Sequence, residues 1–118
     1  MERKYRLRLN TDFQRVRQKG NSWANHLMVL CVLPNDLEHS RFGFAASKRI
    51  GKAVIRNRVR RRMREAVRLR FGAIEEGWDM VFIARSAIAD SDYAMLSSAV
   101  ENVLTRANLY KSLDSENE

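Results

Sequence analysis

The sequence predicts an α+β fold, a two-layer sandwich of three helices and a small mixed sheet. Short apolar runs bounded by turn residues indicate strands, and apolar residues at steps of three and four behind capping residues indicate helices. These segments follow one another in the irregular order helix, three strands, helix, strand, helix. Because the chain has 118 residues, we expect a single domain over residues 1–110 and a disordered tail over 111–118.

The first elements are a short helix and a strand. Asn10 or Thr11 is placed to cap a helix from Asp12 to about Lys19, and Gly20 ends it. A near-continuous apolar run from His26 to Leu33 then predicts a buried strand.

Two shorter stretches flank that apolar run. Residues Ser22 to Asn25 form an extension of it or a separate short strand, and Arg41 to Ser47 form another strand. The loop LPNDLEHS predicts an antiparallel hairpin between this strand and the apolar run. Phe42 and Phe44 share one strand face and are expected in the core, so the small residues of the other face are a candidate groove floor: Gly43, Ala45 and Ser47.

The second half adds a long helix, a strand and a last helix. Their expected bounds are Lys52 to Phe71, Asp79 to Arg85 and, after a cap at Ser91 or Asp92, up to about Ala107. The apolar stripe of the long helix is Ile55, Val59, Met63, Ala66 and Val67, and that of the last helix includes Met95, Val100, Val103 and Leu104.

The charge of the chain is unevenly distributed. Its net charge is +8, with about +14 in residues 1–71 and −6 in residues 72–118. Such asymmetry favours one polyanion-binding face, with nucleic acid as the first candidate and an anionic membrane surface as a weaker one. No apolar run approaches the length of a membrane span. The single cysteine, Cys31, fits a reducing compartment, and we expect a cytoplasmic location.

A basic helix is the strongest functional signal. Between Lys48 and Arg70 lie 11 of the 22 Lys and Arg residues and one acidic residue, Glu65. A ridge at helical spacing comprises Arg56, Arg60, Arg64 and Arg68; Arg58, Arg61 and Arg62 lie beside it, and Lys48, Arg49 and Lys52 extend it into the preceding loop. A solvated basic face is the alternative, but one glutamate leaves most of these charges without an acidic partner along the helix.

Two uncharged residues have open interpretations. Asn57, between two arginines, is either an exposed helix residue or a contact to a sugar hydroxyl, a base edge or a hydrated ion. Phe13, on the short helix near basic residues, either packs in the core or stacks an unpaired base.

Catalytic patterns are missing from the sequence. His26, His39 and Cys31 lack metal-ligand spacing, and the pair Asp90 and Asp92 is better explained by a helix cap. No glycine-rich phosphate loop is present. We therefore assign no catalytic residue and no metal ligand to the chain.

One long motif resembles a known family. The string SKRIGKAVIRNRVRRRMREAVR is similar to the signature of the protein subunit of bacterial ribonuclease P, whose core is Arg-Asn-Arg in a basic helix. The matching positions are Lys48, Arg49, Gly51, Ala53 and Arg56-Asn57-Arg58. DFQRVRQKG, RFGFAAS and DMVFIAR extend the likeness over about residues 5–110.

The resemblance implies a fold and a function. The fold is an α/β sandwich with a left-handed βαβ crossover. The protein binds a catalytic RNA, one protein per RNA, and assists it in removing the 5′ leader of precursor tRNA. Magnesium ions are held mainly by the RNA, which carries the active site. A cleft between the sheet and the first helix takes the single-stranded leader.

The resemblance also implies the site residues. The motif residues assigned to RNA binding are Lys48, Arg49, Lys52, Arg56, Asn57, Arg58, Arg60 and Arg61, and the charge pattern of the basic helix adds Arg62, Arg64 and Arg68. Those assigned to the leader are Phe13, Arg17, Cys31, Ser47 and Arg85. Arg17 and Cys31 stand where other members have aromatic residues, so we expect leader binding here to use more charge and less stacking.

Two other functions are also compatible with the overall positive charge. One is a non-catalytic RNA-binding protein of ribosomal or chaperone-like type, and the other is a DNA-binding protein without sequence preference. The Arg-Asn-Arg motif in its longer context separates ribonuclease P from both.

Overall fold

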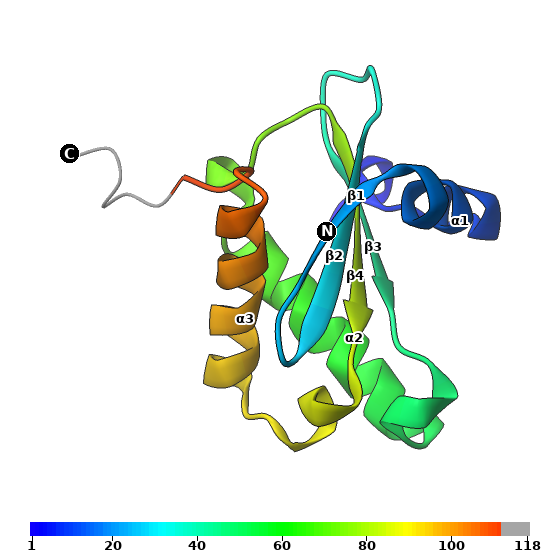
Figure 1. Ribbon diagram of the computed structural model, residues 1–118, viewed down its shortest axis with the longest axis vertical. Helices are drawn as coiled ribbons and strands as arrows, with labels where there is room; N and C mark the ends of the chain where they lie inside the picture. The colour runs from blue at the N-terminus through cyan, green and yellow to red at the C-terminus, as the bar shows by residue number, and fades with distance from the viewer. Residues whose placement is uncertain (112–118) are drawn as a thin grey trace.

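The computed structural model describes residues 1–111 and contains a four-stranded mixed sheet with helices on both faces (Figure 1). The helices are α1 (Asn10–Lys19), α2 (Ala53–Arg68) and α3 (Tyr93–Arg106); the strands are β1 (Asn21–Ala24), β2 (Met28–Pro34), β3 (Arg41–Ala45) and β4 (Trp78–Ala84). Short 3-10 helices are η1 (Arg3–Tyr5), η2 (Lys48–Ile50), η3 (Phe71–Ala73) and η4 (Ser86–Asp90). The α+β class and the order of the elements agree with the prediction, and the segment before the apolar run forms the separate strand β1.

The strand order is β1-β2-β4-β3. β2 pairs antiparallel with both β1 and β4, whereas β3 pairs parallel with β4. The predicted hairpin between β2 and β3 is therefore wrong, because β4 lies between them. Met80, Val81 and Phe82 of β4 are fully buried, and a strand that is apolar on both faces belongs at the centre of a sheet.

Helix α2 connects the parallel neighbours β3 and β4, as a parallel pair requires. The left-handed sense of this crossover stays a prediction. α2 is shorter than expected at both ends: Lys52 is its N-cap, and Gly72 lies in η3 beyond its end. Asp92 caps α3 as predicted, since its side chain accepts a hydrogen bond of 2.8 Å from the Met95 N–H. Helix α1 instead begins at Asn10, without a side-chain cap.

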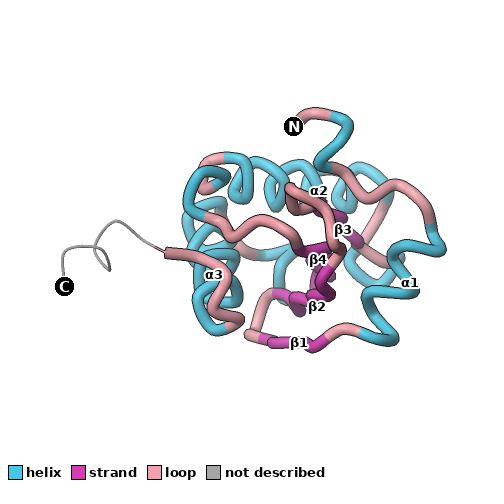
Figure 2. The backbone as a smooth tube through the Cα atoms, turned by 90° about the horizontal axis from the view of Figure 1, so that it is seen from above, coloured by secondary structure: helices cyan, strands magenta, loops and turns pink. Residues whose placement is uncertain are grey.

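Helices α2 and α3 cover one face of the sheet, and α1 lies on the other (Figure 2). In the covered face, Phe42 and Phe44 are buried as predicted, and Phe44 stacks on Phe82 with ring centroids 5.6 Å apart. The predicted stripe of α2 is also buried, except for the partly exposed Ile55.

The predicted stripe of α3 contains one error. Met95 is 54% exposed, and Leu96, at 1%, takes its place in the core. The buried residues of this helix are Leu96, Ala99, Val100, Val103 and Leu104, which follow the steps of three and four that place side chains on one helix face.

On the opposite face, α1 covers only one end of the sheet. Val16 of α1 packs with Leu7, Cys31 and Val81 in a small separate cluster. Ile83, two residues after Val81 on the same strand face, is only partly buried. Part of this face is thus left open.

No helix within the described residues is long and apolar enough to cross a membrane. The expected tail, residues 111–118, lies outside the described residues except for Lys111, whose N–H donates to the Ala73 carbonyl at 3.1 Å.

Candidate nucleic-acid interface

An open groove of about 860 Å³ lies along β3, the edge strand of the sheet, and extends onto the face that carries α1. Its walls come from the N-terminal segment, α1 and α2, and its floor comes from β3 and the loop after it. Within the described residues, the arginines that line it are Arg6, Arg8, Arg17, Arg49, Arg60 and Arg64, and none of the lining residues is acidic. Such a groove attracts a polyanion and offers guanidinium groups to its phosphates.

The small residues that the strand alternation predicted lie in the floor, and Phe42 and Phe44 of the same strand line the groove as well. Gly43, Ala45 and Ser47 line the groove together with Ala46. Phe13 also lines it, although its half-buried ring packs against the cluster that contains Val16. The two interpretations of Phe13 as core residue and as groove aromatic therefore both describe this side chain.

Arg60 and Arg64 bring the charge of α2 into the groove. The Arg64 guanidinium lies 5.6 Å from the centroid of the Phe44 ring. Burial lowers its pKa from the usual arginine value, and the positive charges of Arg6 and Arg60 lower it further. Like charges thus converge on one wall, and an anion in the groove would relieve their repulsion.

Arg60 makes two hydrogen bonds at the start of this wall. It donates to the Ala46 carbonyl at 3.4 Å and to Oδ1 of Asn57. Asn57 therefore orients Arg60, and it does not itself line the groove.

The other residues assigned to RNA binding lie outside the groove. Arg68 pairs with Glu65 at 2.6 Å, and the pair is exposed to solvent. Arg58 and Arg61 are also exposed. Of the assigned set, Arg49, Arg60 and Arg64 line the groove; Lys48, Lys52, Arg56, Asn57, Arg58, Arg61, Arg62 and Arg68 do not.

The structure brings together three of the five residues assigned to the leader. Phe13, Arg17 and Ser47 line the groove, whereas Cys31 and Arg85 do not. Cys31 is only 6% exposed; burial raises the pKa of its thiol, and the nearby charge of Arg17 partly opposes the rise. Arg85 follows β4 and donates to the Asn25 carbonyl at 2.8 Å.

Sequence reasoning missed Arg6 and Arg8. They lie on an extended segment beside β3, where the Leu7 N–H donates to the Phe42 carbonyl at 2.8 Å. Leu7 is buried, and both arginines are exposed in the groove. The alternation Arg-Leu-Arg-Leu at residues 6–9 was the available signal, since it is typical of a half-buried extended strand.

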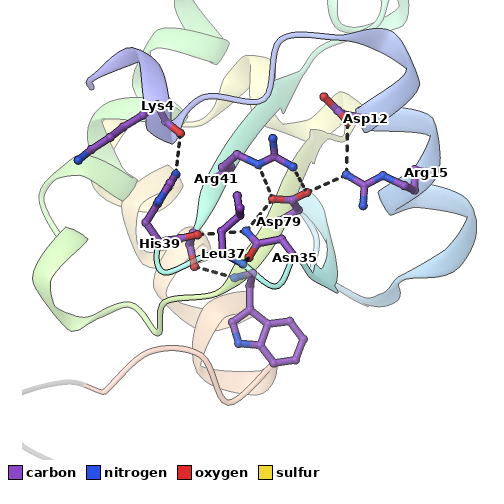
Figure 3. Close-up of polar contacts among 10 residues, drawn as sticks. Lys4, Asp12, Arg15, Asn35, Leu37, His39, Arg41 and Asp79 are labelled. Carbon is purple, nitrogen blue, oxygen red and sulfur yellow. Dashed lines mark hydrogen bonds and ion pairs between the residues drawn. The ribbon is translucent and has the colours of Figure 1, made fainter.

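A buried carboxylate fixes the wall formed by α1 (Figure 3). Asp79, at the start of β4, is fully buried and accepts two hydrogen bonds from Arg41, at 2.9 and 2.7 Å. Arg15 of α1 donates to it at 2.9 Å, and the Asn35 side chain donates at 3.0 Å. The network joins α1, β3, β4 and the loop after β2, so it holds α1 at one end of the sheet.

These contacts also set the charge state of Asp79. Burial alone would raise its pKa, but the hydrogen bonds from Arg41, Asn35 and Arg15 outweigh it and hold the pKa below the usual 3.8. The carboxylate is therefore ionised at neutral pH, with the positive charge of two arginines beside it.

The network continues toward the N-terminal segment. The Asn35 side chain donates to the His39 carbonyl at 3.1 Å, and Nε2 of His39 donates to the Lys4 carbonyl at 3.1 Å. The His39 ring also packs edge-on against Tyr5, 5.4 Å between centroids. The segment that carries Arg6 and Arg8 is thus anchored just before it enters the groove.

Metal-binding groups do not gather in the described residues. No three His, Cys, Asp or Glu side chains of residues 1–111 lie close enough together to hold a metal ion.

Comparison with known proteins identifies the family of this chain. The family model described as Ribonuclease P matches residues 1–108. The ribonuclease P protein component of Roseiflexus castenholzii is 48% identical over 98% of this chain and 96% of its own length. That of Alkaliphilus oremlandii is 40% identical over 91% of this chain and 94% of its own.

Solved structures show the same fold. The RNase P protein of Staphylococcus aureus superposes with a TM-score of 0.85 and 34% identity, over 91% of this chain and 98% of that one. The RNase P protein of Thermotoga maritima gives 0.79 and 32%, over 86% and 96%. The fold is that of the RNase P proteins, and the chain belongs to the ribonuclease P protein family.

Proposed function

We propose that this chain acts as the protein component of ribonuclease P, with the ribonuclease P RNA as its partner in 5′ processing of tRNA. Its membership of the family supports this function. The observation that carries it is the groove, which is lined by six arginines and no acidic residue within the described part of the chain. Such a surface binds RNA, whereas the chemistry of cleavage requires groups that this surface does not offer.

The groove is suited to the 5′ leader of precursor tRNA. Arg17, Arg60 and Arg64 can contact phosphates from two opposite walls, while Phe13 offers an aromatic surface to an unpaired base. The exposed side of α2, with Arg58 and Arg61, remains for the ribonuclease P RNA. We further propose a complex of one protein per RNA.

Magnesium belongs to the RNA in this proposal. The described residues offer no cluster of acidic, histidine or cysteine side chains for a metal ion. The protein instead contributes fixed positive charge, which reduces the phosphate repulsion that magnesium must otherwise screen. We place the complex in the cytoplasm, where precursor tRNA of bacteria is made.

The test is cleavage of precursor tRNA by a bacterial ribonuclease P RNA across a magnesium series. We expect no cleavage by the protein alone and a higher rate with protein present, most clearly at low magnesium. An Arg60→Ala/Arg64→Ala variant should lose much of this gain, because both arginines line the groove. Cleavage by the RNA-free protein would overturn the proposal. RNA binding without any effect on cleavage would favour a ribosomal or chaperone-like role.

A further inference from the structure

Gly43 occupies the middle of β3, on the face that forms the groove floor. Glycine weakens a strand, because its backbone loses more freedom on folding and it has no side chain to pack. Its φ angle does not lie in the left-handed region that favours glycine. The backbone alone therefore does not explain why a glycine stands at this buried position.

The neighbouring side chain provides the explanation. A Cβ atom at position 43 would lie 2.6 Å from Cζ, 2.8 Å from Cε1 and 3.2 Å from Cε2 of Phe13. The three nearest atoms thus belong to the tip of one ring, and two of them would be closer than real Cβ contacts allow. The ring of Phe13 occupies the space that a side chain at position 43 would need.

We propose that Gly43 is a positioning residue for Phe13. Its missing side chain lets the ring tip of Phe13 rest on the floor of the groove, so that an unpaired RNA base can stack on the ring while arginines hold the adjacent phosphates. The inference rests on the proposed function, because the stacked base belongs to the leader of precursor tRNA.

An alanine at position 43 should move Phe13 without unfolding the protein. The obstacle is the far end of a side chain that is only half-buried and can rotate away. Ordinary carbon contacts require about 3.5–4.0 Å, so the ring tip must retreat by roughly 1 Å. Gly72→Ala is the matched control, because nothing lies within 4 Å of a Cβ atom at that position.

The first measurement needs no RNA. Protein labelled with ¹³C at the Cζ positions of phenylalanine gives one ring signal per residue, and Phe13→Ala identifies the signal of Phe13 by its loss. We expect Gly43→Ala to shift this signal and Gly72→Ala to leave it in place. An unmoved Phe13 signal in Gly43→Ala overturns the proposal, whatever the protein binds.

The second measurement is a double-mutant cycle on the assembled ribonucleoprotein. Binding is compared for precursor tRNA with a leader of several nucleotides and for mature tRNA. A stacked base is worth about 1–3 kcal/mol, so Phe13→Ala should weaken binding of the precursor by roughly 5- to 150-fold. Gly43→Ala should also weaken it, by about fivefold or more, with little effect on mature tRNA.

The cycle separates the two proposals. In the Phe13→Ala background, Gly43→Ala should cause no further loss, because no ring is left to displace. An equal loss in both backgrounds, or a wild-type affinity of Gly43→Ala beside a clear effect of Phe13→Ala, overturns the role of Gly43 and leaves the leader groove standing. No effect of Phe13→Ala overturns stacking in the groove, and the role of Gly43 with it.

Failure of Gly43→Ala to fold would still be informative. If the ring of Phe13 is the obstacle, the double variant Phe13→Ala/Gly43→Ala folds, since the three nearest atoms have been removed. A double variant that also fails to fold shows that position 43 has another obstacle, and this overturns the proposal.

Discussion

The two faces of the sheet are built differently. The face under α2 and α3 is closed, and large side chains such as Phe42, Phe82 and Met63 are almost fully buried there. Among the three helices, only α1 lies on the other face; its Val16 is buried at one end of that face, while Ile83 of β4 remains partly exposed. The closed face therefore stabilises the fold. The other face leaves small and apolar residues accessible in a groove that arginines border.

The largest expected effect is a loss of stability from a substitution in the closed face. Phe82→Ala should lower the free energy of unfolding by about 3–5 kcal/mol, because a fully buried aromatic ring leaves a cavity in a closed core. Urea denaturation followed by circular dichroism measures the loss. The neighbouring residue, Ile83, is the matched control on the open face.

Ile83→Ala should cost about 1 kcal/mol, since part of its side chain already contacts water. It should instead alter the groove that it lines. Equal losses of stability at the two positions would contradict the view that the closed face stabilises the fold while the open face serves binding.

A smaller effect should come from the junction between α1 and the sheet. Asp79→Asn preserves the shape of the side chain but removes a charge that Arg15 and Arg41 share. We expect a loss of about 2 kcal/mol at neutral pH; the arginines, with 35% and 27% of their side chains exposed, remain partly hydrated.

The loss should depend on pH in a defined direction. The pKa of Asp79 in the folded protein lies below the usual 3.8, so its contribution to stability is fully present above that value. It disappears as the pH falls through the folded-state pKa. The difference in melting temperature between wild type and Asp79→Asn should therefore shrink as the pH falls below about 4.

Asp36→Asn is the control for this experiment. Asp36 is exposed, and its positive φ of 60° suits asparagine as well as aspartate. It should leave the stability at pH 7 unchanged. A constant difference between wild type and Asp79→Asn across the acidic range would contradict the role of the ionised network.

The sequence predicted the helices and strands more reliably than it predicted which strands pair in the sheet. Helix and strand follow from local periodicity, and the bounds of β4 and α3 are within about one residue of the prediction. The hairpin between β2 and β3 was expected because the two are consecutive. Each pairs instead with β4, whose fully buried residues Met80, Val81 and Phe82 occupy the centre of the sheet, and no local pattern shows which distant strand will take that place.

In the candidate site, too, local sequence patterns did not reveal contacts between distant segments. The apolar stripe of α2 revealed a helix with a basic face, but not which arginines turn toward the groove. That choice depends on how Val59 and Met63 seat the helix on the sheet. The partners of Asp79 are likewise 38 and 64 residues away in the sequence, at Arg41 and Arg15, and no local pattern connects them.

The smallest expected effect compares the two sides of α2. Arg58→Ala/Arg61→Ala removes two exposed charges outside the groove. Binding of the ribonuclease P RNA should weaken, and the slope of log affinity against log salt should flatten by roughly 0.7–0.9 per lost phosphate contact. The fold should survive, because alanine favours the helix more than arginine does.

Arg60→Ala/Arg64→Ala is the matched pair on the groove side of the same helix. It removes the same charge, so a purely nonspecific attraction would make the two variants indistinguishable in every binding assay. If the sides have separate partners, the groove pair affects precursor tRNA more than mature tRNA. The outer pair then weakens binding of the ribonuclease P RNA and changes the binding of precursor and mature tRNA equally. Unchanged RNA affinity and salt dependence for Arg58→Ala/Arg61→Ala would show that the outer arginines form only a solvated face.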